Sequence, residues 1–353
     1  MIGFVPAVGS GWSDLVKTGQ DMRMRETIRQ YVKQGPWKTA GFYDWMPEVP
    51  AAGSSDALRF FGTRRPYTAR GGFLRPFHDF AGLWRDVNLL RPFTLLGAIP
   101  CITARVRYGT PYVLTIGADH VAVARQRGEG RQRWKWRLLQ SVAVRLAAAT
   151  IVRNPAHAEI LRSRYPRANM VTIPNWVDTD LFSPMPGGPR SRSTVVLYVG
   201  RLTAEKGLIE AARLFRKLGY SFVCVGEGPG RRALDRQGAH AVGAVQWTAL
   251  PDIYRSADVF LLPSQSEGHP KALSEAMACG VPCIVRAEVA QSLRLPAETV
   301  VRFNGSLAAA LQVALEPAAR RTIGTQAADY VLANWAKEKV LAEEIALCAG
   351  HSR

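Results

Sequence analysis

Short apolar runs alternate with longer segments of mixed polarity along most of the chain. The apolar runs cover residues 2–7, 86–90, 111–117, 149–153, 169–174, 195–199, 222–225 and 258–262. Such runs predict buried strands, and the segments between most of them are long enough for helices. Because strands that alternate with helices form parallel sheets covered on both faces, the pattern predicts an α/β fold.

Two segments interrupt this alternation. Residues 35–84 are rich in Gly, Pro and aromatic residues without clear periodicity, so we assign no strand there. Residues 183–193 form a Pro-, Gly- and Ser-rich stretch of the kind that links domains. A length of 353 residues suits two domains. We therefore predict an N-terminal domain over 1–182, a C-terminal domain over 193–330 and a terminal helix over 331–353.

Composition indicates the class of protein. Hydrophobic residues make up 47% of the chain and charged residues 21%, as in a soluble globular enzyme. The five cysteines are scattered and mostly lie in apolar runs, which indicates buried thiols in a reducing cytoplasm. The N-terminus lacks the basic and apolar regions of a signal peptide, and no apolar stretch approaches the roughly 20 residues of a spanning helix. We expect a cytoplasmic protein.

The segment after the run at 258–262 carries candidate chemistry. Pro270 suits the first turn of a helix, where its missing N–H has no intrahelical partner. Lys271 and Ala272 would then present backbone N–H groups to a phosphate. Glu267 precedes this helix and Glu275 lies within it. Carboxylates do not hold phosphate, so we expect them to accept hydrogen bonds from the hydroxyl groups of a sugar-like ligand.

The run at 195–199 leads into a second candidate site. It is followed by Gly200, Arg201 and, five residues later, Lys206. Arginine offers a planar fork to phosphate oxygens and lysine a movable charge, so the pair can neutralise a diphosphate without a metal. A turn with a salt bridge to Glu205 would explain Arg201 alone.

Three strings resemble the signatures of retaining GT-B glycosyltransferases of the family four type. The first is Glu267-Gly-x-Pro followed by Glu275, with seven residues between the two glutamates. The others are Gly-Arg-Leu-x-x-Glu-Lys-Gly over 200–207 and Gly-Glu-Gly-Pro-Gly over 226–230. The resemblance implies two Rossmann-like domains facing a cleft, with the last helix crossing back onto the first domain. It also implies sugar transfer from a nucleotide-diphosphate sugar to an acceptor, with no metal or other cofactor.

The resemblance assigns roles to individual residues. Glu267 contacts the transferred sugar, although whether it acts as a nucleophile stays open, and Glu275 binds the ribose hydroxyls. Arg201 and Lys206 meet the charge of the departing diphosphate. The remaining residues expected to contact the donor are Gly11, Gly200, Gln246, Gly268, His269, Lys271, Ala272 and Leu273. The Gly-rich string at 226–230 is expected to let the backbone pass close to the nucleotide.

The chain also departs from the family pattern. Members often carry a His-Gly pair facing the transferred sugar, whereas this chain has Gly117-Ala-Asp119-His120, so Asp119 and His120 are equal candidates for that role. A helix-capping aspartate is the alternative for Asp119. Trp176 replaces a usual glycine, the usual glycine is not found over 244–247, and no glycine-rich loop follows Arg286.

Charge is distributed unevenly. The net charge is +18, and residues 1–180 hold 26 Lys and Arg against 13 Asp and Glu, while residues 181–353 hold 20 against 15. Within 125–137, two tryptophans are interleaved with six basic residues. A solvated helix face explains the arginines but not paired exposed tryptophans, which favour a membrane boundary. The residues expected to meet the acceptor or an anionic membrane are Arg131, Arg133, Trp134, Lys135, Trp136 and Arg137.

We therefore predict a peripheral enzyme at the inner face of the membrane with a lipid-linked or glycan acceptor. Two alternatives remain. A nucleotide-sugar epimerase shares the fold but needs catalytic acids and bases that form no recognisable string here. The charge of +18 could indicate a nucleic-acid-binding protein, but no helix-turn-helix, RNP or zinc-finger pattern is present, so we expect no nucleic acid. The sequence leaves the donor sugar, base, acceptor and linkage open.

Overall fold

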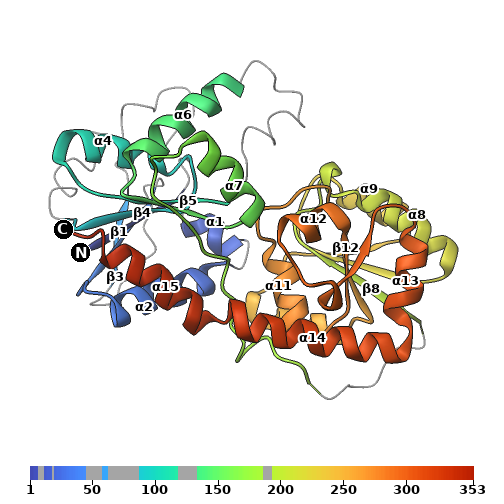
Figure 1. The fold of residues 1–353 in the computed structure, drawn as a ribbon. Helices are drawn as coiled ribbons and strands as arrows, with labels where there is room; N and C mark the ends of the chain where they lie inside the picture. The colour runs from blue at the N-terminus through green and yellow to red at the C-terminus, as the bar shows by residue number, and fades with distance from the viewer. Residues whose placement is uncertain (7–11, 18–19, 45–57, 63–86, 118–132, 186–192) are drawn as a thin grey trace. The chain divides into compact units, whose positions relative to one another are not determined.

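The computed structural model describes residues 1–353 except 7–11, 18–19, 45–57, 63–86, 118–132 and 186–192 (Figure 1). The chain divides into two compact units. Unit 1 comprises Met1–Pro174 and Leu341–Arg353, and unit 2 comprises Asn175–Val340. Residues 175–182, which the sequence places in the first domain, therefore lie in unit 2.

Unit 1 is built on two parallel sheets. The first has the order β3-β2-β1-β4, with strands at Leu58–Gly62 (β3), Ala40–Asp44 (β2), Ile2–Val5 (β1) and Leu89–Pro92 (β4). The second has the order β5-β6-β7, with strands at Val113–Ile116, Ala149–Val152 and Met170–Thr172. A single bridge between Leu90 and Tyr112 joins the two sheets. Strands β2 and β3 lie in the segment where the sequence pattern assigned none.

The helices of unit 1 connect these parallel strands. Their bounds are Trp12–Lys17 (α1), Asp21–Gln34 (α2), Ala98–Tyr108 (α4), Arg133–Leu146 (α6) and Pro155–Arg164 (α7). Helix α6 precedes β6, and α7 connects β6 to β7. Because such crossovers are right-handed, α6 and α7 cover the same face of the β5-β6-β7 sheet.

Unit 2 is built on one six-stranded parallel sheet. Its order is β10-β9-β8-β11-β12-β13, with strands at His240–Gly243, Ser221–Val225, Val195–Val199, Val259–Leu262, Cys283–Arg286 and Val301–Phe303. The helices are Leu208–Leu218 (α8), Arg231–Arg236 (α9), Leu250–Ser256 (α10), Lys271–Ala278 (α11), Ala287–Ser292 (α12), Leu307–Leu315 (α13) and Pro317–Trp335 (α14). The predicted α/β class is confirmed in both units.

The helical segment at the end of the chain is interrupted at Ala336. Helix α14 ends at Trp335, Ala336 is extended, and α15 begins at Lys337 and runs to Ala349. The interruption arises because Val177 pairs with this stretch. Its N–H donates to the Trp335 carbonyl and its carbonyl accepts from the Lys337 N–H, each over 2.8 Å. Asp178 adds an ion pair to Lys337 at 2.9 Å.

The end of α15 is fixed in unit 1 by a buried charge cluster. Glu344 accepts a hydrogen bond from the hydroxyl of Tyr31, a residue of α2, at 2.7 Å. Its carboxylate also lies 2.6 Å from Arg91 Nη2 and 2.8 Å from Arg153 Nη2. Burial alone would raise the pKa of Glu344, but Arg153 and Arg91 hold it at about 2. The carboxylate is therefore charged at neutral pH.

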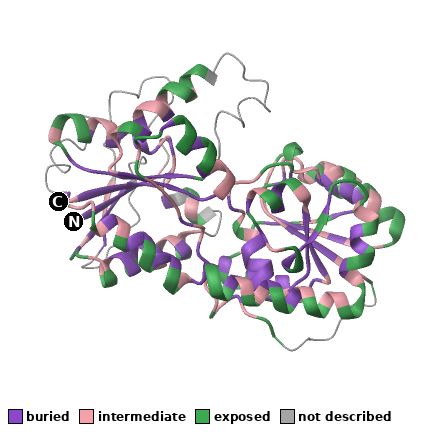
Figure 2. Ribbon diagram, in the orientation of Figure 1, coloured by how far each residue is buried: buried purple, intermediate pink, exposed green. Residues whose placement is uncertain are grey.

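The strands of both units are mostly buried (Figure 2), and most of their buried side chains are apolar. All five cysteines are free and buried, as the sequence predicts. Burial raises the pKa of Cys279 to about 12, so its thiol is protonated at neutral pH. After β12, where the sequence lacks a glycine-rich loop, the chain turns directly into the short helix α12. In the part of the chain that the structure describes, no helix has the length and hydropathy needed to span a membrane.

Candidate functional site

The candidate site lies where the chain reverses direction in the sheet of unit 2. From β8 the chain proceeds outward through β9 to β10, then returns to β11 on the other side of β8. In open parallel sheets, ligands bind outside the carboxyl ends of the strands at such a switch point. The two loops that leave this point carry residues 200–207 after β8 and residues 263–270 after β11.

Lys206 and Glu267, one from each loop, form an ion pair. Lys206 Nζ lies 2.5 Å from Glu267 Oε1, and the two side chains are only 14% and 15% exposed. A short 3-10 turn over Ala204–Lys206 holds the lysine, and it ends at Gly207, whose φ of 68° suits glycine. The structure thus brings together two residues that the sequence predicts to act on one ligand.

Arg201 stands on the same loop but is exposed. Its carbonyl accepts a hydrogen bond from the Tyr198 hydroxyl at 3.1 Å. Burial, and then the negative charge of Glu267, raise the pKa of Tyr198. The neutral phenol therefore remains a donor that holds the backbone at Arg201, while the guanidinium extends into solvent.

The glycine string after β9 packs against the loop after β8. A Cβ atom on Gly226 would lie 2.0 Å from the Gly200 carbonyl oxygen, and one on Gly228 would lie 2.3 Å from the Leu202 carbonyl oxygen. The Gly230 N–H donates to that same Leu202 oxygen over 2.8 Å. These glycines allow two backbones to touch, so the string shapes the loop that carries Arg201 and Lys206.

Glu275 is buried in unit 2 with both carboxylate oxygens engaged. It is 4% exposed. Its Oε1 accepts from Trp247 Nε1 at 3.2 Å, and its Oε2 accepts from the Tyr254 hydroxyl at 3.1 Å. Trp247 and Tyr254 thus hold one carboxylate oxygen each and fix the orientation of the group. Sequence reasoning missed Trp247 and Tyr254, although a buried Trp or Tyr usually needs a hydrogen-bond partner.

Helix α11 begins one residue later than the sequence predicts. Pro270 has the extended conformation of an N-cap residue, and Lys271 is the first helical residue. Lys271 is exposed and Ala272 half-buried, but the Leu273 side chain is fully buried in the core. Only the backbone of Leu273 is therefore suited to a donor at this helix end.

The ring of His269 lies in the interior of unit 2. It is buried and packs edge-on against Trp335, with 4.5 Å between ring centroids. The His269 carbonyl accepts from Asn175 Nδ2 at 2.7 Å. Trp176, which follows Asn175, packs edge-on against Trp247, with 6.1 Å between ring centroids. The predicted contact of His269 with a donor is thus restricted to its backbone, and Trp176 supports the residue that holds Glu275.

A glycine with a positive φ lies directly before residues 244–247, where the sequence lacks the family's usual glycine. This residue is Gly243, at the end of strand β10, and its φ of 94° favours glycine. The Ala244 N–H donates to Glu227 Oε1 at 3.2 Å. Gln246 is exposed and precedes a short 3-10 turn.

Part of the predicted site falls outside the described residues. Gly11, Asp119, His120 and Arg131 lie there, and the side chain of Arg133, the first residue of α6, is also not described. In the remainder of α6, Trp134, Lys135 and Arg137 are exposed. Trp136 instead packs against the hydrophobic core of unit 1. The prediction of two exposed tryptophans is wrong for Trp136, because two residues along a helix turn the side chain by about 200°.

The charged residues of the site do not form a metal-binding cluster. Within the described ranges, no group of three or more His, Cys, Asp or Glu side chains is placed to hold a metal ion. The site in unit 2 instead combines a lysine, an exposed arginine and a helix start with two carboxylates. This combination suits a ligand that carries both phosphate and hydroxyl groups.

Comparison with known proteins gives a consistent result. Residues 193–314 match the family model described as Glycosyl transferases group 1. The GDP-mannose-dependent alpha-mannosyltransferase of Mycolicibacterium smegmatis is 33% identical over 215 residues, covering 56% of this chain and 55% of that protein. The Escherichia coli UDP-Gal:alpha-D-GlcNAc-diphosphoundecaprenol alpha-1,3-galactosyltransferase is 33% identical over 136 residues, covering 32% and 35%. The chain thus spans about half or less of these relatives.

A solved structure resembles the whole chain. The sucrose-phosphate synthase from Thermosynechococcus elongatus superposes with a TM-score of 0.82 over 98% of this chain and 97% of that one, at 20% identity. The likeness confirms the predicted GT-B fold.

Proposed function

We propose that the whole chain is a glycosyltransferase, because residues 193–314 match the family model described as Glycosyl transferases group 1. It moves a hexose-type sugar from a nucleotide-diphosphate sugar to an acceptor hydroxyl, with retention at the anomeric carbon. One observation carries the proposal: Lys206 and Glu267 meet at the switch point of the unit 2 sheet, within 2.5 Å of each other. This position is where parallel sheets bind nucleotides.

The ion pair puts the group proposed to bind the departing diphosphate next to the group proposed to bind the sugar. When the glycosidic C–O bond breaks, negative charge grows on the departing diphosphate and must be stabilised by fixed positive groups. Lys206, Arg201 and the N–H groups at the start of α11 supply them. Since Lys206 also contacts Glu267, the carboxylate proposed to face the sugar hydroxyls lies beside the cation proposed to face the diphosphate. No metal is required in this scheme.

The nucleotide is held through Glu275. Its carboxylate accepts from the ribose hydroxyls, and Trp247 and Tyr254 act as positioning residues because they fix the carboxylate from behind. A fixed acceptor loses little conformational entropy when the ligand binds. GDP and UDP sugars, the donors in the names of the two relatives, are both candidates for the donor.

The acceptor is proposed to be lipid-linked, or a glycan, in cell-surface polysaccharide or glycolipid synthesis. One relative is named for a diphosphoundecaprenol acceptor. The excess of basic residues lies over 1–180, and Trp134 and Arg137 are exposed on α6. Basic residues near an anionic surface each contribute on the order of 1 kcal/mol to docking. We therefore place the enzyme at the cytoplasmic face of the membrane as a peripheral protein.

Donor binding and turnover test the proposal. Saturation-transfer NMR against UDP, GDP and ADP sugars should identify one preferred donor class. Lys206→Ala should lower turnover at least a hundredfold and, because it leaves Glu267 without its ion-pair partner, should also lower the melting temperature somewhat. Lys217→Ala, which changes an exposed lysine at the end of α8, should alter neither. Turnover should persist after chelation of divalent ions.

Three results would contradict the proposal. They are no binding of any nucleotide sugar, full dependence of turnover on added magnesium or manganese, and conversion of the donor into its epimer without an acceptor. Tight binding of random DNA at moderate salt would favour the nucleic-acid alternative.

A further inference from the structure

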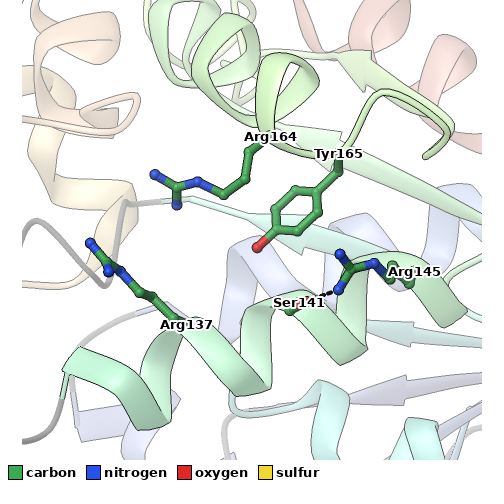
Figure 3. Close-up of a pocket in the computed structure, with 5 residues that line it drawn as sticks. All are labelled: Arg137, Ser141, Arg145, Arg164 and Tyr165. Atoms are coloured by element: carbon green, nitrogen blue, oxygen red, sulfur yellow. Dashed lines mark hydrogen bonds between the residues drawn. The ribbon is translucent and has the colours of Figure 1, made fainter.

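A basic pocket lies between α6 and α7 in unit 1. It has a volume of about 440 Å³ and is lined by Arg137, Ser141, Arg145, Arg164 and Tyr165 (Figure 3). Helix α6 ends before β6 begins, and α7 ends before β7 begins. The C-terminal halves of both helices therefore lie toward the amino ends of these parallel strands, away from the edge where a parallel sheet places its catalytic loops. The pocket is distinct from the candidate site in unit 2.

Helical spacing explains how these residues come together. Arg137, Ser141 and Arg145 follow one another at intervals of four residues and form one stripe on α6. Arg164 ends α7, and Tyr165 directly follows it. Arg145 donates to the Ser141 hydroxyl and lies over the Tyr165 ring, 5.4 Å from its centroid. Figure 3 shows the Arg137 and Arg164 side chains on one side of the Tyr165 hydroxyl and Arg145 on the other.

The helix dipole explains only part of the clustering of arginines around this pocket. Arginines near helix C-termini are favoured by the helix dipole, which explains Arg145 and Arg164. Arg137 lies in the second turn of α6, where the dipole gives a cation no such support. In the described part of the chain, none of these three arginines pairs with a carboxylate. Three guanidinium groups around one pocket without an acid make it a favourable place for an anion.

We infer that this pocket binds the phosphate group of an anionic lipid headgroup. Arginine forks match phosphate oxygens, and the Ser141 and Tyr165 hydroxyls offer further hydrogen bonds. The volume of about 440 Å³ corresponds to roughly fifteen waters of liquid volume at about 30 Å³ each, which exceeds the needs of a lone phosphate. A phosphoglycerol headgroup would use that space.

Two exposed apolar side chains favour a lipid over a soluble phosphate. Trp134 is 61% and Leu138 57% exposed, four residues apart on α6. At about 100° per residue, both lie within about 60° of the Arg137, Ser141 and Arg145 stripe. A soluble phosphate would not contact these apolar side chains, whereas Trp and Leu beside a basic face are typical of helices that lie in a membrane interface. The inference gives a site to the membrane contact of the proposed function, on which it rests.

Vesicle flotation with matched double variants tests the inference. Arg137→Gln with Arg164→Gln should weaken binding to phosphatidylglycerol vesicles about tenfold, while Arg105→Gln with Arg107→Gln, which removes the same charge from the exposed face of α4, should change it less than threefold. Tyr165→Phe, which removes one hydroxyl, should weaken binding about threefold. Phosphatidylcholine vesicles should bind little, and melting temperatures should stay unchanged because the replaced arginines are exposed.

Several outcomes would overturn the inference. Equal losses in the two double variants would show general charge attraction rather than a site. Calorimetric binding of inorganic phosphate or glycerol phosphate that is lost in the pocket variant, without vesicle binding by the parent protein, would assign the pocket to a soluble phosphate. Because the assay contains no nucleotide sugar, failure here with donor binding intact would leave the proposed transfer reaction standing.

Discussion

Replacing Glu344 should destabilise unit 1. Glu344→Gln keeps the size of the side chain but removes the charge that faces Arg91 and Arg153, which lie 2.6 and 2.8 Å away. The Arg91 side chain is fully buried, so its charge would lose its main counter-charge in a region of low dielectric. Removing one partner of a buried ion pair typically costs about 3–5 kcal/mol.

The pKa of Glu344 gives a second measure of the same energy. Its ordinary value is 4.5 and its value in the fold is about 2. At 1.36 kcal/mol per pH unit, this difference corresponds to about 3 kcal/mol, in agreement with the first figure. Because the folded pKa is the lower one, this stability is present above pH 4.5 and is lost as the pH falls toward 2. Glu344→Gln should lack that component of acid sensitivity.

Hydrogen exchange measured by mass spectrometry can assign the loss to one unit. A chain with two units need not unfold in one step, so a single melting curve is insufficient. Peptides from β4 and α15 should lose about 3 kcal/mol of protection in Glu344→Gln, while peptides from β8 and β11 should not change. The matched control is Glu343→Gln, an exposed neighbour that should cost less than about 0.5 kcal/mol. A loss below 1 kcal/mol in unit 1, or equal losses in both variants, would refute this reasoning.

Three further predictions concern the candidate site and α6. Glu275→Ala should weaken nucleotide-sugar binding, measured by calorimetry, by about 1–3 kcal/mol. Tyr254→Phe removes one donor to the carboxylate, so it should weaken binding less and keep the fold. Unchanged binding in both variants would show that Glu275 does not contact the ribose. Gly226→Ala should abolish folding of unit 2 or lower its melting temperature sharply, because the new Cβ would lie 2.0 Å from a carbonyl oxygen; a normal melt would contradict the packing. Trp136→Ala should destabilise unit 1 by about 1–3 kcal/mol, because the ring is partly buried against the core, whereas Trp134→Ala should leave the melting temperature unchanged and lower vesicle binding.

The sequence predicts the parts of the site that depend on local pattern. Lys206 and Glu267 are far apart in the chain, yet each follows an apolar run, and neighbouring parallel strands deliver their following loops to one edge. That rule is enough to bring the two together. Strands β2 and β3 escaped detection because their segment lacks alternation and is rich in glycine and aromatics.

Other features could not be predicted because they depend on packing between distant elements. Helical spacing puts Glu344, four residues from both Val340 and Cys348, on the apolar side of α15. Only the approach of β4 and of the segment after β6 makes it the partner of Arg91 and Arg153. The support of Glu275 by Trp247 is similar. The error over Trp136 was of another kind, since applying the helical period to α6 would have separated it from Trp134.

The position of Glu344 has a consequence for folding during synthesis. The N-terminal segment of unit 1 emerges from the ribosome first, with Arg91 on β4 and Arg153 after β6, while the whole of unit 2 is still to be made. Their common counter-charge arrives only when residue 344 is translated. Until then the two arginines must stay hydrated. Because unit 1 is discontinuous in the chain, its N-terminal segment completes its core only after unit 2 has had time to fold.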